Sequence, residues 1–141
     1  MDETARIAVE WIKDLEATLS KPTCAVVVGL SGHLGAGKTA FVAAVARQLG
    51  VTGDVVSPTF VIMKQYATNH SLWSFLVHID AYRLESPQEL EAINWNALRA
   101  DPKNLIMVEW PENVAIIPDQ ALALEQRQLP GRVSEVHIEV R

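Results

Sequence analysis

A glycine-rich segment followed by lysine and threonine is the first place where residue types and spacing point to chemistry. Four residues separate Gly32 from Gly37, and Lys38 and Thr39 follow at once, which is the spacing of a P-loop. Backbone N–H groups of such a loop surround a phosphate, and glycines let the chain approach it without a Cβ in the way. Lys38 then supplies a cation for the β- and γ-phosphates, and Thr39 a hydroxyl for Mg²⁺. The segment predicts triphosphate binding; the alternative is a glycine-rich turn that binds nothing, although a chance turn need not carry the Lys-Thr pair.

Two carboxylates stand where they could complete such a site. Asp80 ends the largely apolar stretch 75–79, and Glu109 ends the apolar stretch 105–108. Ligands of open α/β sheets bind beyond the carboxyl ends of the strands, so we expect both carboxylates to face one crevice. One could hold Mg²⁺ beside Thr39, and the other could align the attacking water or accept its proton. We favour Glu109 for the metal and Asp80 for the water, the alternative being that one of them is a helix cap or a structural ion-pair partner.

Hydrophobic patterning predicts the elements that hold these residues. The apolar run 25–30 has the composition of a buried parallel strand, and residues 40–50 predict a helix that ends in glycine. Strand, loop and helix thus follow in the order that a phosphate site needs, with the helix N-terminus facing the anion. An amphipathic helix is predicted from about Thr4, because apolar residues recur there at every fourth position: Ile7, Trp11, Leu15 and Leu19.

Further elements follow along the chain. Ser86 and Glu89 form a capping box with Pro87 at the first helical position, which predicts a helix start. The expected fold is α/β, a three-layer sandwich with a central mixed β-sheet flanked by helices and a C-terminal β-hairpin. The pattern predicts a hairpin over residues 60–66 and 75–80, a helix over 87–100, a strand over 104–109 and a terminal hairpin over 121–129 and 133–140.

Length and composition limit the class of protein. A chain of 141 residues is expected to form one domain over residues 1–141. Hydrophobic residues make up 49% of the sequence and charged residues 21%, which is typical of soluble globular proteins and excludes disordered or fibrous ones. No apolar run approaches the roughly 20 residues of a membrane helix, and residues 1–20 lack the pattern of a signal peptide. We therefore expect a cytoplasmic protein without membrane contact.

Cysteine content and net charge narrow the chemistry further. Cys24 is the only cysteine, which excludes an internal disulfide and a cysteine metal cluster. A net charge of −5 argues against a broad basic face for nucleic acid. Any RNA is therefore expected to be held by a partner.

Five segments taken together carry a family resemblance. They are Gly32-His33-Leu34-Gly35-Ala36-Gly37-Lys38-Thr39, Ser57-Pro58-Thr59-Phe60, His78-Ile79-Asp80-Ala81-Tyr82-Arg83-Leu84-Glu85, Pro87-Gln88-Glu89-Leu90-Glu91 and Val108-Glu109-Trp110-Pro111-Glu112. In order and spacing the chain resembles the bacterial TsaE family from about Thr4 to Arg132. A P-loop alone is common to a very large superfamily, whereas its combination with the Asp-x-Tyr-Arg and Val-Glu-Trp-Pro segments is specific.

The resemblance implies a P-loop NTPase-like fold and a function. TsaE proteins are small ATPases required for threonylcarbamoyladenosine formation in tRNA, and they act with the TsaB and TsaD proteins. The implied function is that of an ATP-binding and ATP-hydrolysing accessory protein of the TsaB–TsaD complex, with ATP and Mg²⁺ as cofactors and tRNA contacted only through the complex. Turnover without partners is expected to be slow, because the sequence contains no evident arginine finger.

The resemblance also assigns roles to site residues. Lys38, Asp80 and Glu109 are expected to be catalytic, and Thr39 and Glu109 to hold the metal. The residues expected to contact the nucleotide are Thr4, Gly32, His33, Leu34, Gly35, Ala36, Gly37, Lys38, Thr39, Ala40, Trp110 and Arg132.

Some of these positions carry alternatives or departures from the family pattern. Trp110 is either a nucleotide contact or a hydrophobic plug after the strand. Thr4 and Arg132 match positions that flank the base. His33 stands where the family usually has an acid, so any part of that acid in hydrolysis is absent here. Asn94-Trp95 stands where a glycine is common at the helix end, which predicts a changed surface turn.

Two other functions use the same loop. A small-molecule or nucleoside kinase transfers the γ-phosphoryl group to a bound alcohol, but kinases generally surround that group with arginines on a mobile lid, and residues 67–74 contain none. A guanine-nucleotide switch would carry an Asn-Lys-x-Asp segment after a late strand, and the sequence has none.

Overall fold

The computed structural model describes residues 3–18, 23–31, 38–53, 55, 62–114, 127–128 and 137–140. Of the residues expected to form the site, Gly32 to Gly37 and Arg132 lie outside these ranges, as does Leu19 of the expected N-terminal helix. The described part includes Lys38, the carboxylates and the aromatic residue beside them.

A mixed sheet forms the centre of the described fold. Its strands span Val26–Ser31 (β1), Met63–Ala67 (β2), Phe75–Asp80 (β3), Asn104–Glu109 (β4), Arg127–Gln128 (β5) and His137–Val140 (β6). They lie in the order β2-β3-β4-β1-β6-β5. β1, β3 and β4 are parallel, whereas β2 runs antiparallel to β3 and β6 antiparallel to β1. The predicted mixed sheet and the β2–β3 hairpin are therefore confirmed.

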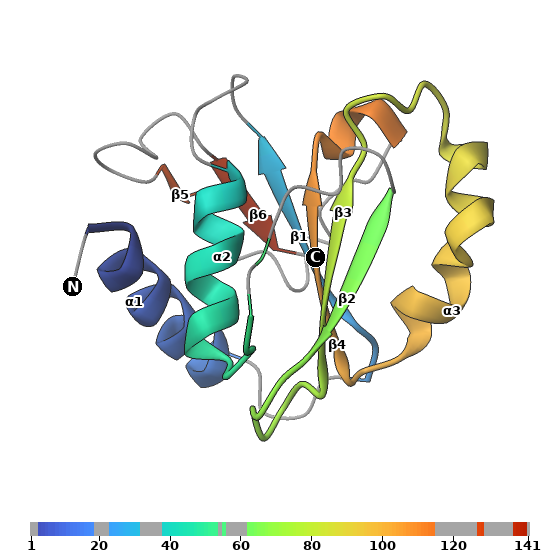
Figure 1. Ribbon diagram of the computed structural model, residues 1–141. Helices are drawn as coiled ribbons and strands as arrows, with labels where there is room; N and C mark the ends of the chain where they lie inside the picture. The colour runs from blue at the N-terminus through green and yellow to red at the C-terminus, as the bar shows by residue number, and fades with distance from the viewer. Residues whose placement is uncertain are drawn as a thin grey trace.

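Helices cover both faces of this sheet. They are α1 (Glu3–Thr18), α2 (Lys38–Gln48) and α3 (Trp95–Ala100), with 3₁₀ helices η1 (Pro87–Ile93) and η2 (Pro111–Val114). Figure 1 shows α1 and α2 on one side of the sheet and α3 on the other. Among the described residues, no helix combines the length and the apolar character needed to cross a membrane.

Alternation along the strands divides the core between the two faces. In β1, Val28 and Leu30 are buried on the side of α1 and α2, where the rings of Trp11 and Phe41 meet edge to face with 5.5 Å between their centroids. Val27 is buried on the opposite side with residues of η1 and η2. Apolar residues on both faces are what a central parallel strand requires. The expected α/β architecture with flanking helices is confirmed.

The helix predicted over residues 87–100 is instead two helices, which corrects that expectation. η1 ends at Ile93, and α3 begins after Asn94, whose φ of 57° lies in the left-handed region. Asparagine tolerates this conformation better than most side chains, so the chain can turn here where a glycine would be typical. At the start of η1 the Glu89 carboxylate accepts hydrogen bonds from the backbone N–H groups of Glu85 and Ser86, which lower the pKa of Glu89.

Other element boundaries also differ from the prediction. α2 begins at Lys38, two residues earlier than expected, so the lysine and threonine of the predicted loop belong to the first helical turn. It ends as predicted, with Gly50 at a φ of 84°. The expected terminal hairpin is present as the antiparallel pair β5–β6, of which two and four residues are described; residues 121–126, 129 and 133–136 of the predicted strands lie outside the described part of the chain.

Candidate functional site

Three parallel strands end level with one another at one edge of the sheet. Asp80 of β3 is paired in register with Glu109 of β4, and Leu30 of β1 is paired with Glu109 on its other side. The chain leaves β1 at this same edge, and the predicted P-loop follows β1 in the sequence. The expectation that the two carboxylates end neighbouring strands is therefore confirmed.

Glu109 lies at the centre of the site and is only 4% exposed. Its Oε2 atom accepts a hydrogen bond from the Thr39 hydroxyl at 3.0 Å. The same oxygen lies 2.6 Å from Nε2 of His78, whose side chain is fully buried. A buried carboxylate is costly unless donors surround it, and these two groups supply them. The hydroxyl and the carboxylate predicted to share a metal are thus in direct contact.

Lys38 lies beside this group and is also buried. Its Nζ atom is 4.4 Å from the centroid of the Trp110 ring, which is the distance of a cation–π contact. Desolvation lowers the pKa of Lys38, and the negative charges of Glu109, Glu112 and Asp80 oppose that shift. The ammonium group is therefore held between an aromatic face and three acids.

Trp110 has an unusual backbone conformation, with φ at 60°. Large side chains rarely adopt positive φ, and such strain is found mostly at functional sites. The Trp110 N–H donates to the carbonyl of Leu30 at 3.3 Å, and its ring lies 5.3 Å from the ring of Tyr82. These contacts hold the indole against Lys38, the position that the resemblance implied.

Asp80 is partly buried and begins a tight turn. Its Oδ1 accepts a hydrogen bond from the Tyr82 N–H at 3.0 Å. The side-chain amide of Asn113 donates to the carbonyls of Ala81 and Tyr82, which fixes this turn against η2. Asp80 also contributes to the charge that Lys38 experiences.

Of the other residues predicted for the site, Thr4 and Ala40 are described. Thr4 lies in the first turn of α1, which packs against α2. Ala40 is exposed in the first turn of α2. Gly32 to Gly37 and Arg132 lie outside the described residues.

His78 is the residue that sequence reasoning missed. Side chains alternate along a strand, so His78 and Asp80 point to the same face of β3. Leu76 and Met107 belong to the core beneath α1 and α2, which places His78 and Glu109 on that same face. A histidine inside an apolar strand, two residues before a predicted site carboxylate, is the signal that could have found it.

Comparison with known proteins agrees with the resemblance. A family model described as "Threonylcarbamoyl adenosine biosynthesis protein TsaE" matches residues 1–134. The chain is also similar to several proteins named "tRNA threonylcarbamoyladenosine biosynthesis protein TsaE". The Synechocystis sp. protein is 36% identical over 115 residues, which are 79% of this chain and 68% of that protein. The Mycobacterium bovis protein is 33% identical over 135 residues (91% and 76%), and the Streptomyces coelicolor protein 42% identical over 87 residues (61% and 57%). The chain therefore belongs to the TsaE family, which is named for the biosynthesis of threonylcarbamoyladenosine in tRNA.

Proposed function

We propose that this protein binds and hydrolyses ATP with Mg²⁺ and that it does so in the threonylcarbamoyladenosine modification of tRNA. The observation that carries the proposal is the 3.0 Å hydrogen bond that the Thr39 hydroxyl donates to Glu109. Thr39 directly follows Lys38 in the sequence. This hydrogen bond joins the end of a glycine-rich P-loop sequence to a buried carboxylate at the edge of the sheet.

Phosphate binding is supported by the place where α2 begins. The helix starts at Lys38, immediately after Gly37. The first N–H groups of a helix have no partner within it, and together with the helix dipole they favour an anion. The order of β1, glycine-rich segment and α2 is that of a P-loop NTPase-like fold.

The residues present fit a magnesium ion that arrives with the nucleotide. Mg²⁺ prefers oxygen ligands and is usually held by one or two carboxylates together with phosphates and waters. Thr39 and Glu109 supply such oxygens. Among the described residues, no group of three or more His, Cys, Asp or Glu side chains could hold a metal by itself. When bound, the ion neutralises charge on the phosphates during phosphoryl transfer.

The roles of the other side chains follow from their positions. Lys38 contacts the phosphates, whose negative charge adds to that of the acids near its ammonium group. Asp80, at the neighbouring strand end, orients the attacking water or accepts its proton. Trp110 limits how far Lys38 can move.

The biological role rests on the family. We propose that the protein is an accessory ATPase of the TsaB–TsaD complex, and that tRNA is held by the complex. The net charge of −5 favours this division. Hydrolysis by the isolated protein is expected to be slow, because a supplied arginine finger alone can raise such rates by about 10³- to 10⁵-fold.

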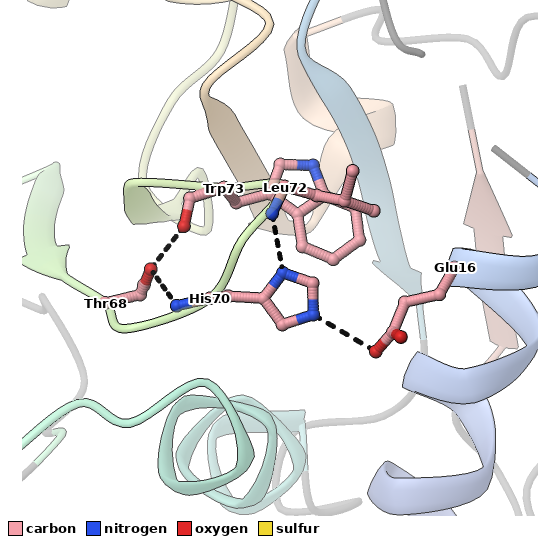
Figure 2. A network of polar contacts seen from close by, with 5 residues as sticks. All are labelled: Glu16, Thr68, His70, Leu72 and Trp73. Carbon is pink, nitrogen blue, oxygen red and sulfur yellow. Dashed lines mark hydrogen bonds and ion pairs between the residues drawn. The ribbon is translucent and has the colours of Figure 1, made fainter. Parts of the chain in front are cut away.

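A kinase would need a mobile lid over the phosphates, and residues 67–74 are the segment considered for that role. This segment lies at the opposite end of β3 from Asp80. There the Asn69 N–H donates to the carbonyl of Leu49 at 2.8 Å, and His70 contacts Glu16 of α1 (Figure 2). The segment is thus joined to α1 and to the end of α2, which favours hydrolysis over transfer to a second substrate.

ATP hydrolysis by the purified protein, with and without Mg²⁺, tests the proposal, with Lys38→Ala as the matched variant. We expect slow, Mg²⁺-dependent phosphate release that rises when TsaB, TsaD and tRNA are added and that Lys38→Ala abolishes. A wild-type protein that binds no ATP would contradict the proposal, and phosphorylated nucleoside in the same assay would favour the kinase.

A further inference from the structure

His78 is a fully buried titratable residue for which the proposed function has no use. It lies on β3, two residues before Asp80 and on the same face of the sheet. Its Nε2 atom is 2.6 Å from Oε2 of Glu109 on β4, and that oxygen also accepts the Thr39 hydroxyl from α2. Three elements are thus joined at a single carboxylate oxygen.

The surroundings of the ring indicate which nitrogen carries the proton. Nδ1 of His78 is buried and has no hydrogen-bond partner among the described residues. A proton on Nδ1 would be a buried donor without an acceptor, which costs more free energy than an unpaired acceptor nitrogen does. The short contact between Nε2 and Oε2 and the absence of a described partner for Nδ1 therefore favour a proton on Nε2, donated to Glu109.

We propose that His78 is a positioning residue, which holds the Glu109 carboxylate against Thr39 in the orientation that a magnesium-bound nucleotide requires. This inference rests on the proposed function. Without the Nε2–H donor, the carboxylate would keep only the Thr39 hydroxyl of these two donors and could turn toward Lys38. Hydrogen bonds that orient a metal ligand typically change metal affinity by about 10- to 100-fold when they are removed.

A purely structural role for the His78–Glu109 pair makes a different prediction. If the pair only stabilised the junction of β3 and β4, its loss would lower thermal stability and leave metal affinity unchanged. The test must therefore measure metal binding separately from folding and from hydrolysis.

Three variants separate these roles. His78→Leu removes the donor and keeps an apolar side chain, whereas His78→Gln keeps an amide N–H that can reach Glu109. His70→Leu is the matched control, because it removes a histidine–glutamate contact of 3.0 Å at the other end of the sheet. The probe is Mn²⁺, which takes the same oxygen ligands as Mg²⁺. Binding of Mn²⁺ to the complex with a β,γ-imido analogue of ATP is followed by electron paramagnetic resonance, and analogue affinity is measured in EDTA.

We expect His78→Leu to weaken Mn²⁺ binding by about 10- to 100-fold while analogue affinity in EDTA stays within about twofold of wild type. His78→Gln should recover most of the loss, and His70→Leu should bind Mn²⁺ like wild type. Wild-type Mn²⁺ affinity in a folded His78→Leu protein would overturn the inference, as would equal losses in His78→Leu and His70→Leu.

Failure of the proposed function is distinguishable from failure of this inference. If wild type binds no Mn²⁺ with the analogue, or Glu109→Gln does not weaken that binding, the site itself is wrong. If Glu109→Gln weakens it and His78→Leu does not, only the role of His78 is wrong. Should His78→Leu not fold, His78→Asn takes its place, because its shorter amide corresponds to the Nδ1 position of the ring: weakened Mn²⁺ binding supports the inference, and wild-type Mn²⁺ affinity overturns it.

Discussion

Among the described residues, two histidine–glutamate contacts lie at opposite ends of the sheet, and they differ in how their partners are arranged. His70, in the connection between β2 and β3, uses both ring nitrogens: Nδ1 accepts the Leu72 N–H at 3.0 Å, and Nε2 lies 3.0 Å from Glu16 of α1 (Figure 2). Its ring stacks on Trp73 at 4.8 Å. Each contact is local or reaches a helix surface, and the Glu16 side chain is 43% exposed. This pair attaches the connection between β2 and β3 to α1.

The His78–Glu109 pair has no such complete explanation in the fold. It is buried, its carboxylate is shared with Thr39, and Nδ1 of the histidine has no partner among the described residues. Beside it, Trp110 holds a strained backbone and Lys38 is desolvated. Buried polar groups that the fold does not fully satisfy, together with backbone strain, are expected where a ligand completes the structure. A buried polar atom without a partner also occurs at the other end, at Nε1 of Trp73, so the shared carboxylate, the strained Trp110 backbone and the desolvated Lys38 are what distinguish the carboxylate end as the candidate site.

The largest expected effect is on hydrolysis at the carboxylate end. Glu109→Gln and Asp80→Asn keep the shape of each side chain but remove its charge. Asp80→Asn should lower the rate of ATP hydrolysis by about 10²- to 10⁴-fold, as is typical when a general base is lost. Glu109→Gln removes a charged metal ligand and should lower the rate as well. Single-turnover phosphate release measures this. ATP affinity should fall less than the rate, and full activity in either variant would exclude that residue from the reaction.

Loss of the lysine should act on binding. Lys38→Ala removes charge-assisted hydrogen bonds to phosphate, and each lost bond is expected to weaken ATP binding by about 10- to 100-fold. Fluorescence of a labelled nucleotide measures the affinity. Binding within a few-fold of wild type would show that the nucleotide lies elsewhere.

A smaller effect is expected from a substitution at Gly29, which lies next to the proline that follows Trp110. A Cβ added at Gly29 of β1 would lie 3.0 Å from Cγ of Pro111, which follows Trp110 directly. Gly29→Ala should therefore lower the free energy of unfolding by about 1–3 kcal/mol through overpacking and shift η2 with its tryptophan. Urea unfolding and the emission spectrum of the protein test this. Wild-type stability would mean that Pro111 can move to make room, and the backbone next to it at Trp110 would then not be held rigidly at the carboxylate end.

The smallest effect is expected at the exposed pair. Glu16→Gln removes the carboxylate that contacts His70, and such partly exposed contacts contribute at most about 0.2–1 kcal/mol. Thermal unfolding should shift slightly, with ATP binding and hydrolysis unchanged. Weaker nucleotide binding in this variant would remove the distinction drawn between the two pairs.

The sequence was sufficient for those parts of the site that depend on local pattern. Apolar strands that end in Asp80 and Glu109 are visible in the sequence, and parallel pairing then brings the two ends together. The contact between His78 and Glu109 was not predicted, although a histidine two residues before Asp80 was a visible signal; the register of β3 and β4 joins these distant residues. The break at Asn94 was predicted only in part: the family pattern indicated a changed turn at this position, but the capping box at Ser86 favoured one helix over residues 87–100.

Calorimetric titration of the β,γ-imido analogue of ATP, with and without Mg²⁺, is the most direct test of the central claim that the carboxylate end binds a magnesium nucleotide. Wild type and Glu16→Gln should bind the analogue more tightly when Mg²⁺ is present, and Glu109→Gln should lose most of that gain. Absence of binding by wild type, or the same Mg²⁺ dependence in Glu109→Gln as in wild type, would contradict the account.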